Sequence, residues 1–183
     1  MNQKTAMKLF GLLGLLMLLS CGYADRHRNS SSCEQALVDS LEVRVQDSLF
    51  SNVHYSRSQL LEALTQTQDS LVYYRLLALY GKTFFVSSDF DSILYYNRRV
   101  KEFSRNASQS SESLQSPRWN DVLSDVYNIE GNVWMQLNRP DSAIIDYKKA
   151  YGYRLEGKKL HLLPDICINI ADAYLHRSDL AHT

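Results

Sequence analysis

Side chains that could bind a metal or act as nucleophiles are scattered along this chain of 183 residues. The histidines are His27, His54, His161, His176 and His182. No two of them have the HExxH or i,i+4 spacing that puts two imidazoles on one helix face, and no cysteine or carboxylate completes a zinc set. The glycines form no phosphate-binding loop, and no GxSxG motif occurs. The sequence therefore predicts neither an enzyme nor a resident metal or cofactor.

One cysteine lies in a sequence context with a specific chemical meaning. A basic start and an apolar run, Leu9–Leu19, lead to the sequence Leu18-Leu19-Ser20-Cys21. Eleven helical residues span about 16 Å, half of a bilayer core, which suits a signal-peptide core rather than a membrane span. The residues before the cysteine resemble the lipobox of bacterial lipoproteins, which implies a thioether-linked diacylglycerol on Cys21, further acyl chains such as palmitate, and cleavage after Ser20. The alternatives are an ordinary secretory signal and a short uncleaved anchor.

Cleavage at this site changes what the composition means. Removal of residues 1–20 takes away two lysines and no acid, so the remaining 163 residues would carry a formal charge of −2. Such a chain, without clustered Lys and Arg, does not suit nucleic-acid binding. Residues 21–33 are small and polar, as in a flexible tether between a lipid and a folded domain. We therefore expect a lipid-anchored protein on the inner or outer membrane, facing the periplasm or the exterior.

The remaining cysteines leave two interpretations open. Cys33 lies in the tether and Cys167 in a predicted helix near the C-terminus. An oxidising compartment would permit a disulfide between them, but their spacing gives no geometric support for one. We favour two free thiols.

Residues 34–183 are predicted to form a single helical domain, and its first helices follow from the spacing of apolar residues. Leu37, Leu41, Val45 and Leu49 recur every four residues. This spacing predicts a helix over about 34–50 with one apolar face. A second helix is predicted over about 58–67, carrying Leu60, Leu61 and Leu64, with the break at 52–57.

Two later segments repeat each other at a distance of 50 residues, from Gly81 to Gly131. Asp91-Ser92 follows the first glycine at the same distance as Asp141-Ser142 follows the second, and an aliphatic, Tyr-rich stretch follows each pair. Asp and Ser at these places are expected to supply a helix N-cap and first turn. The pattern is an internal repeat of two helices.

The second copy resembles the tetratricopeptide repeat. Its signature residues are Tyr127, Gly131, Trp134, Ala143, Tyr147 and Ala150, while Glu130 stands where the family has Leu. In the first copy Gly81 and Phe84 fit, but Ile93, Asn97 and Val100 replace the small, aromatic and small residues of the second helix. A third start carries Ala171 and Tyr174 at the small and aromatic positions. The resemblance implies an all-α solenoid of antiparallel helix pairs.

The resemblance places the units near residues 70–103 and 124–157, with a partial unit at 164–183 and a Ser-rich loop at 104–117 between the first two. Thr183 falls where a second helix of the third unit would start. The face of the third unit's helix that carries Ile166, Ile170 and Ala173 is therefore expected to lack part of its cover.

The family binds proteins or peptides on the concave face formed by its first helices, which implies a protein or peptide partner here. The candidate partner contacts are residues of those helices that are not part of the repeat signature. They are Asn128, Asn132, Gln136 and Lys82, together with Ser88 just after the first helix of the first copy. Asn128 and Asn132 lie one turn apart and could clamp a peptide backbone through their amides. For each residue the plainer interpretation is a solvated helix face. The alternative functions are a truncated periplasmic sensory segment of a signal-transduction regulator and a surface lipoprotein that helps to capture a nutrient polymer.

Five Asp-Ser-aliphatic triplets also allow a second interpretation. They are Asp39-Ser40-Leu41, Asp47-Ser48-Leu49, Asp69-Ser70-Leu71, Asp91-Ser92-Ile93 and Asp141-Ser142-Ala143. They resemble the acceptor for general O-glycosylation of exported proteins in one Gram-negative phylum. The plainer interpretation is that Asp and Ser begin helices and an apolar residue follows.

Overall fold

The computed structural model describes residues 35–45, 51–107 and 116–181, and within these ranges every regular element is helical and none is a strand. The chain divides into two compact units, residues 1–40 and 41–183. The helices that follow residue 50 belong to the second unit. They are α2 (Val53–Gln66), α3 (Ser70–Lys82), α4 (Phe90–Ala107), α5 (Pro117–Gln136), α6 (Pro140–Leu155) and α7 (Leu163–Ala181), with the 3-10 turns η1 (Thr83–Ser87) and η3 (Leu160–Leu162). The predicted all-α fold class is confirmed for the described residues.

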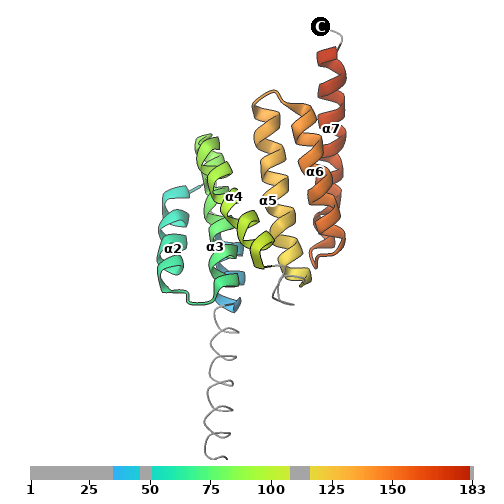
Figure 1. Cartoon of the computed structure of the whole chain (residues 1–183). Coiled ribbons are helices and arrows are strands. Elements are labelled where there is room, and N and C mark those ends of the chain that lie inside the picture. Colours follow the sequence, from blue (N-terminus) through green and yellow to red (C-terminus); the bar gives the residue numbers. More distant parts are fainter. Residues whose placement is uncertain (1–34, 46–50, 108–115, 182–183) are drawn as a thin grey trace, which may run out of the picture. The chain divides into compact units, whose positions relative to one another are not determined.

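Within the second unit each helix packs on the next one along the chain (Figure 1), with the largest interfaces between α5 and α6, α6 and α7, and α3 and α4. Contacts also join α3 to α5 and α5 to α7, the first helices of successive pairs. The core is accordingly a series of clusters between neighbouring helices. One of them joins α3, α4 and α5 through Leu77, Val100, Trp119, Leu123 and Val126.

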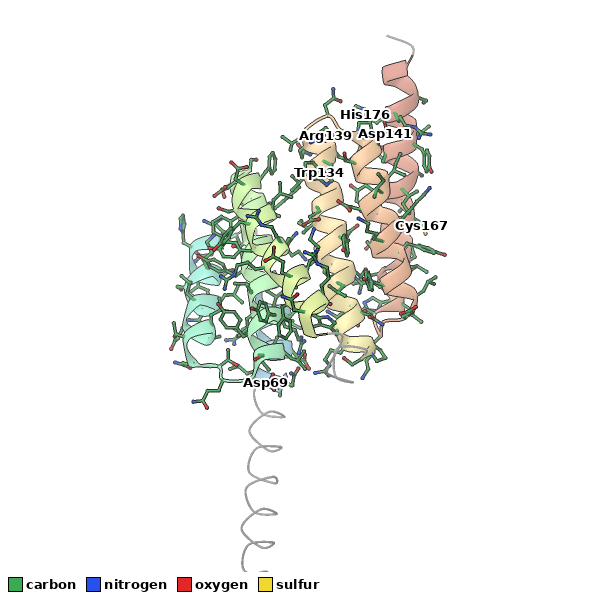
Figure 2. All side chains as sticks on the ribbon, in the orientation of Figure 1. Asp69, Trp134, Arg139, Asp141, Cys167 and His176 are labelled. Atoms are coloured by element: carbon green, nitrogen blue, oxygen red, sulfur yellow. The ribbon has the colours of Figure 1, made fainter. Side chains whose placement is uncertain are left out.

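The internal repeat is visible in the backbone turns that end the first helix of each pair. Ser88 and Asn138, 50 residues apart, both have left-handed backbone, with φ of 52° and 57°. The residue after each donates its N–H to the carbonyl five positions back, from Asp89 to Phe84 at 3.2 Å and from Arg139 to Trp134 at 2.8 Å. Figure 2 shows Trp134 and Arg139 together at the second of these turns. The same chain reversal is therefore built twice.

The second helices of the two pairs bury side chains at equivalent positions. Ile93, Asn97 and Val100 on α4 are all buried, as are Ala143, Tyr147 and Ala150, which follow 50 residues later on α6. Each first helix approaches its partner at a glycine. A Cβ on Gly131 would lie 2.3 Å from Cε1 of Tyr147, and one on Gly81 would lie 2.9 Å from Cβ of Tyr96. The overlay of the two copies thus describes equivalent packing, although the residue types differ.

The helix starts differ in part from the expectation. Asp69 caps α3, accepting from the N–H groups of Leu71 and Val72 at 2.8 and 3.2 Å, which agrees with the helix-start interpretation of its triplet. Asp91 and Asp141, by contrast, lie inside the first turns of α4 and α6. At α4 the preceding acid does the capping, because Asp89 accepts from the N–H of Ser92 at 3.1 Å. Assigning the N-caps to Asp91 and Asp141 was wrong.

The earlier helices also need correction. The predicted break at 52–57 is wrong, because the Asn52 side chain accepts from the Tyr55 N–H at 3.1 Å and α2 begins at Val53. In the helical segment 35–45, Leu37 is 46% exposed and Val38 is buried instead. A strict four-residue spacing drifts off one face of a helix with 3.6 residues per turn, which explains the error. Leu49 lies outside the described residues.

The Ser-rich segment and the last helix differ from the prediction as well. Residues 104–107 continue α4, and the Ser104 hydroxyl accepts from Trp119 Nε1 at 3.0 Å, while 108–115 lie outside the described residues. The first helix of the repeat predicted near residues 124–157 starts at Pro117 rather than near 124. On α7 the face expected to lack cover is the packed one, since Ile166 and Ala173 are buried.

Candidate binding surface

Asn128 and Asn132 lie one turn apart on α5, and both already use their side-chain carbonyls. Asn169 Nδ2 on α7 donates to Asn128 Oδ1 at 3.0 Å, and the Tyr147 hydroxyl on α6 donates to Asn132 Oδ1 at 2.7 Å. Among the described residues neither Nδ2 group has an acceptor. Their amide N–H groups are therefore the atoms that remain for a ligand, and the carbonyls are held in place by neighbouring helices.

The other candidates lie at the same ends of the first helices. Lys82 is the last residue of α3 and half-buried, and it stands 50 residues before Asn132, so the two occupy equivalent places in the two helix pairs. Gln136 is the exposed last residue of α5. Ser88 is exposed in the left-handed turn that follows η1. Because α3 and α5 pack on each other, Lys82, Asn132 and Gln136 belong to neighbouring helix ends.

Two further polar residues reach this region from α7 and were missed in the sequence. Asn169 donates to Asn128. The pKa of the Tyr147 hydroxyl is raised mainly by burial of the side chain and further by the negative charge of Asp172. The phenol therefore stays protonated and donates to Asn132 at any physiological pH. The sequence could have indicated Asp172. Ala171 follows Gly131 by 40 residues in the repeat, and Asp172 follows Asn132 by the same distance, so the two occupy equivalent positions.

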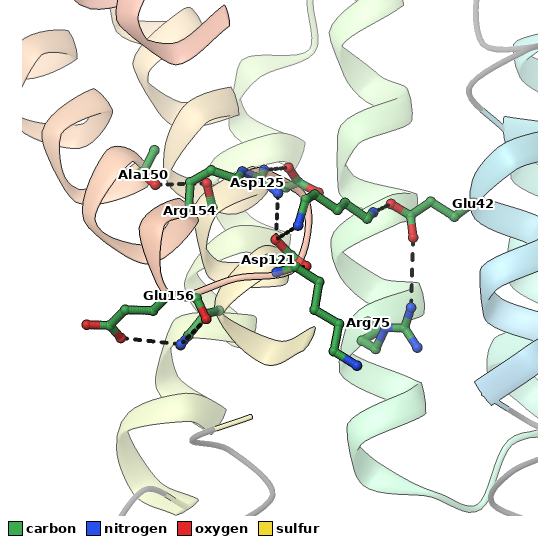
Figure 3. Close-up of polar contacts among 11 residues, drawn as sticks. Glu42, Arg75, Asp121, Asp125, Ala150, Arg154 and Glu156 are labelled. Atoms are coloured by element: carbon green, nitrogen blue, oxygen red, sulfur yellow. Dashed lines mark hydrogen bonds and ion pairs between the residues drawn. The ribbon is translucent and has the colours of Figure 1, made fainter. Parts of the chain in front are cut away.

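At the other end of the same helices a closed ionic network fills the space (Figure 3). Arg154 Nη1 donates to Asp121 Oδ1 at 2.8 Å, and Arg154 Nη2 bonds Asp125. Asp121 also accepts the N–H groups of Lys158 and Lys159 at 3.0 and 3.1 Å, which fastens the turn after α6 to the start of α5. Both Nη groups of Arg154 and both oxygens of Asp121 have partners, while Arg154 Nε is buried without one among the described residues. The contacts join α5, α6 and the turn that follows, so we assign the network a structural role.

Glu42 extends this network to α3. Its carboxylate bonds Lys159 Nζ and lies 3.8 Å from Arg75 Nη2. Segment 41–45 is therefore linked both to α3 and to the turn after α6. Arg75 precedes Lys82 by seven residues, about 10 Å along a helix, so the Glu42 contacts leave the Lys82 end of α3 untouched.

Glu130, which departs from the repeat signature, is buried with a partner from the preceding helix pair. Lys101 Nζ on α4 bonds Glu130 Oε2 at 2.6 Å, and only 4% of the glutamate side chain is exposed. Burial raises the pKa of the Glu130 carboxyl, while Lys101 opposes the shift. The neighbouring Tyr127 is half-buried between Lys101 and Lys149, and burial raises its pKa to about 12. An ion pair thus lies largely buried between α4 and α5.

Within the ranges that the structure describes, the remaining chemistry-bearing residues form no further site. Among the described residues no three His, Cys, Asp or Glu side chains could hold a metal ion. Within the same ranges, no helix has the length and apolar character needed to cross a bilayer. Cys167 is exposed, whereas Cys21 and Cys33 lie outside the described residues. Comparison of the chain with protein-family models, curated proteins and solved structures gives no match.

Proposed function

We propose that this chain is a lipid-anchored scaffold of the cell envelope, built of tetratricopeptide-like helix pairs, that binds an extended segment of a protein partner. The twice-built turn, the shared buried register and the contacts between first helices all support a solenoid of this kind. The observation that carries the binding role is the pair of oriented amides at Asn128 and Asn132.

The chemistry of this pair suits a peptide backbone. Successive carbonyls of an extended peptide alternate in direction, so those on one side recur about every 6.6 Å. Four helical residues rise about 6 Å, so side-chain N–H groups one turn apart can donate to two carbonyls on the same side of the peptide. Because Asn169 and Tyr147 already hold the two Oδ1 atoms, the Nδ2 groups lose little side-chain entropy on binding. Asp172 and Lys82 would add one acidic and one basic contact beside them.

The binding role is tested with two paired substitutions at the same positions. Peptides selected from a random library on the full chain should bind Asn128→Ala/Asn132→Ala at least about tenfold more weakly, a loss of about 1.4 kcal/mol, since two hydrogen bonds are removed. Asn128→Asp/Asn132→Asp keeps the acceptors for Asn169 and Tyr147 but removes the donors, and it should lose binding equally.

A matched control distinguishes loss of the two amides from a general effect of a double substitution on a helix surface. Glu62 and Gln66 are an exposed pair one turn apart on α2, and Glu62→Ala/Gln66→Ala should bind like the parent chain. Thermal unfolding of each variant by circular dichroism separates lost binding from lost folding. Unchanged peptide affinity in a folded Asp pair would remove the amides from the proposed function.

The lipid anchor is tested independently. In a Gram-negative host fed labelled palmitate, the chain should incorporate label and partition with membranes, and Cys21→Ser should abolish both. Cys33→Ser provides the matched control, because that cysteine lacks the lipobox context and its variant should be labelled normally. Label in the Cys21→Ser protein would contradict the anchor.

A further inference from the structure

Side chains at equivalent places of three neighbouring first helices differ in charge. Asn132 follows Lys82 by 50 residues, and Asp172 follows Asn132 by 40, which are the offsets that separate the repeat units. Helix α5, which carries Asn132, contacts α3 on one side and α7 on the other. The candidate surface is therefore basic on its α3 side and acidic on its α7 side, with the two amides of α5 between them.

Contacts on both sides of α5 support this alignment. Toward α3, the left-handed turns at Ser88 and Asn138 show that the two first helices end in the same way. Toward α7, the Tyr147 hydroxyl donates to Asn132 at 2.7 Å, and the charge of Asp172 adds to the effect of burial in raising the pKa of that hydroxyl. Asn132 and Asp172 therefore lie close to the same hydroxyl group.

The charges of Lys82 and Asp172 are available to a ligand. Among the residues that the structure describes, neither the Lys82 ammonium nor the Asp172 carboxylate has an ion-pair or hydrogen-bond partner. Arg75 differs, because it lies seven residues before Lys82 on α3 and is held 3.8 Å from the Glu42 carboxylate. Lys82 and Asp172 do not reach each other, since α5 lies between them and packed helices stand about 8–10 Å apart.

The geometry of an extended backbone brings these two charges to neighbouring residues of a bound segment. Successive carbonyls of such a backbone point in opposite directions, and successive side chains alternate about a perpendicular axis. When every second carbonyl points at α5, where the Nδ2 groups of Asn128 and Asn132 donate, the side chains point alternately toward α3 and toward α7. At the level of Asn132, one side chain thus lies on the Lys82 side and that of the next residue on the Asp172 side.

We propose that the candidate surface selects extended segments in which an acidic residue adjoins a basic residue, the acidic side chain lying beside Lys82 and the basic one beside Asp172. This inference rests on the proposed function, because the amides of Asn128 and Asn132 position the backbone. The opposite placement would bring like charges together, which is unfavourable. Since both sites are open to solvent, the charges select among segments that the amides already bind.

Charge reversal on both partners tests each contact separately. Peptides selected from a random library on the full chain should contain adjacent acidic and basic residues. Changing the acidic residue of such a peptide to Lys should weaken binding about fivefold or more, and Lys82→Glu, but not Asp172→Lys, should restore it. Changing the basic residue to Glu should weaken binding similarly, and here Asp172→Lys, but not Lys82→Glu, should restore it. Restored binding also shows that the variant is folded.

Matched controls are two charge reversals on α4, Arg98→Glu and Glu102→Lys, which alter exposed residues of a second helix and should leave peptide affinity unchanged. Raising the salt concentration to about 0.5 M should reduce the discrimination between charge-reversed peptides, because exposed charges are then screened. The dependence on the two amides should persist at that salt concentration.

The outcomes separate this inference from the proposed function. Selected peptides that lose affinity for Asn128→Ala/Asn132→Ala but lack an acid–base pair would overturn the charge selection and leave the amide role standing. Restoration by the wrong variant, or by both variants equally, would do the same. If the library yields no peptide, or only peptides that bind the Ala pair like the parent chain, the proposed function fails and the charge selection fails with it.

Discussion

Alanine substitutions at two glycines, both inside helices, should have opposite effects on stability. Gly131 lies in α5 where the helix meets the Tyr147 ring, and a Cβ there would lie 2.3, 2.4 and 2.9 Å from ring atoms Cε1, Cδ1 and Cζ. Gly152 lies in α6 with no atom within 4 Å of the same added Cβ. The chemical change and the helical setting are the same, so only the neighbour differs.

The magnitudes follow from two opposing terms. Replacing Gly by Ala in a helix interior gains about 1 kcal/mol, because less backbone entropy is lost on folding. At Gly131 the ring must move by more than about 1 Å to reach ordinary contact distance, and overpacking of this kind costs about 1–3 kcal/mol. The ring has little freedom to move, being buried and bonded through its hydroxyl to Asn132 at 2.7 Å, so the upper part of that range applies. Gly131→Ala should therefore lose about 2 kcal/mol, while Gly152→Ala should gain about 0.5–1 kcal/mol.

Urea unfolding followed by circular dichroism measures both changes on one scale, with equal m values showing that the unfolding reaction is unchanged. A domain of this size should also show a midpoint temperature lower by about 4–8 °C for Gly131→Ala, at about 2–4 °C per kcal/mol. If Gly131→Ala proved as stable as the parent, or if both variants shifted in the same direction, close approach at this glycine would not be what holds α5 against α6.

Four further single substitutions probe the ionic contacts and one helix cap. Lys101→Met should cost about 2–4 kcal/mol of unfolding free energy, because it leaves the buried Glu130 carboxylate without its positively charged partner, and Lys101→Met/Glu130→Leu should recover most of this loss. Urea unfolding of the double-mutant cycle measures the coupling energy, and strictly additive losses would contradict the proposed pairing. Burial raises the Glu130 pKa above its ordinary 4.5, so this group stabilises the fold below that pH and loses its contribution as the pH rises through the folded value; Glu130→Gln should flatten that part of a stability–pH curve. Arg154→Met should cost about 3–5 kcal/mol, because it leaves the buried Asp121 carboxylate with backbone N–H partners but without its positive charge. Thermal unfolding measures the loss, and a loss below about 1 kcal/mol would count against the network. Asp69→Ala should cost about 1 kcal/mol through the lost cap of α3, read from the urea midpoint.

The buried register of the helix pairs was predictable, whereas several helix starts were not. Overlay at 50 residues aligned Ile93 with Ala143 and Val100 with Ala150, and all four are buried, because burial follows helical period rather than residue identity. The N-cap of α4 was missed because acids at 89 and 91 are both suitable, and only the turn geometry selects Asp89.

The candidate surface was predictable only in outline. The i,i+4 spacing placed Asn128 and Asn132 on one face of a helix, as observed. Which of their atoms are available could not be predicted, because the acceptors are taken by Asn169 and Tyr147, which lie 41 and 15 residues away in sequence. Partners of this kind depend on how whole helices pack, and a single sequence contains no direct measure of that packing.

Two buried polar side chains lie at the junction between the first helix pair and the second. Glu130 pairs with Lys101 across α4 and α5. Asn97 stands 50 residues before Tyr147, at the equivalent position of the first copy, and donates from Nδ2 to the Val126 carbonyl, also across α4 and α5, at 3.1 Å. In the second pair the equivalent Tyr147 bonds back to Asn132 within its own pair. The following junction with α7 combines an apolar cluster around Ala143 and Ala173 with the hydrogen bond from Asn169 to Asn128. Glu130 and Asn97 thus each make a polar contact across the junction where the first helix pair meets the second. A buried polar contact is stable only in the register that satisfies it, so this junction defines how the two pairs align more strictly than an apolar contact would.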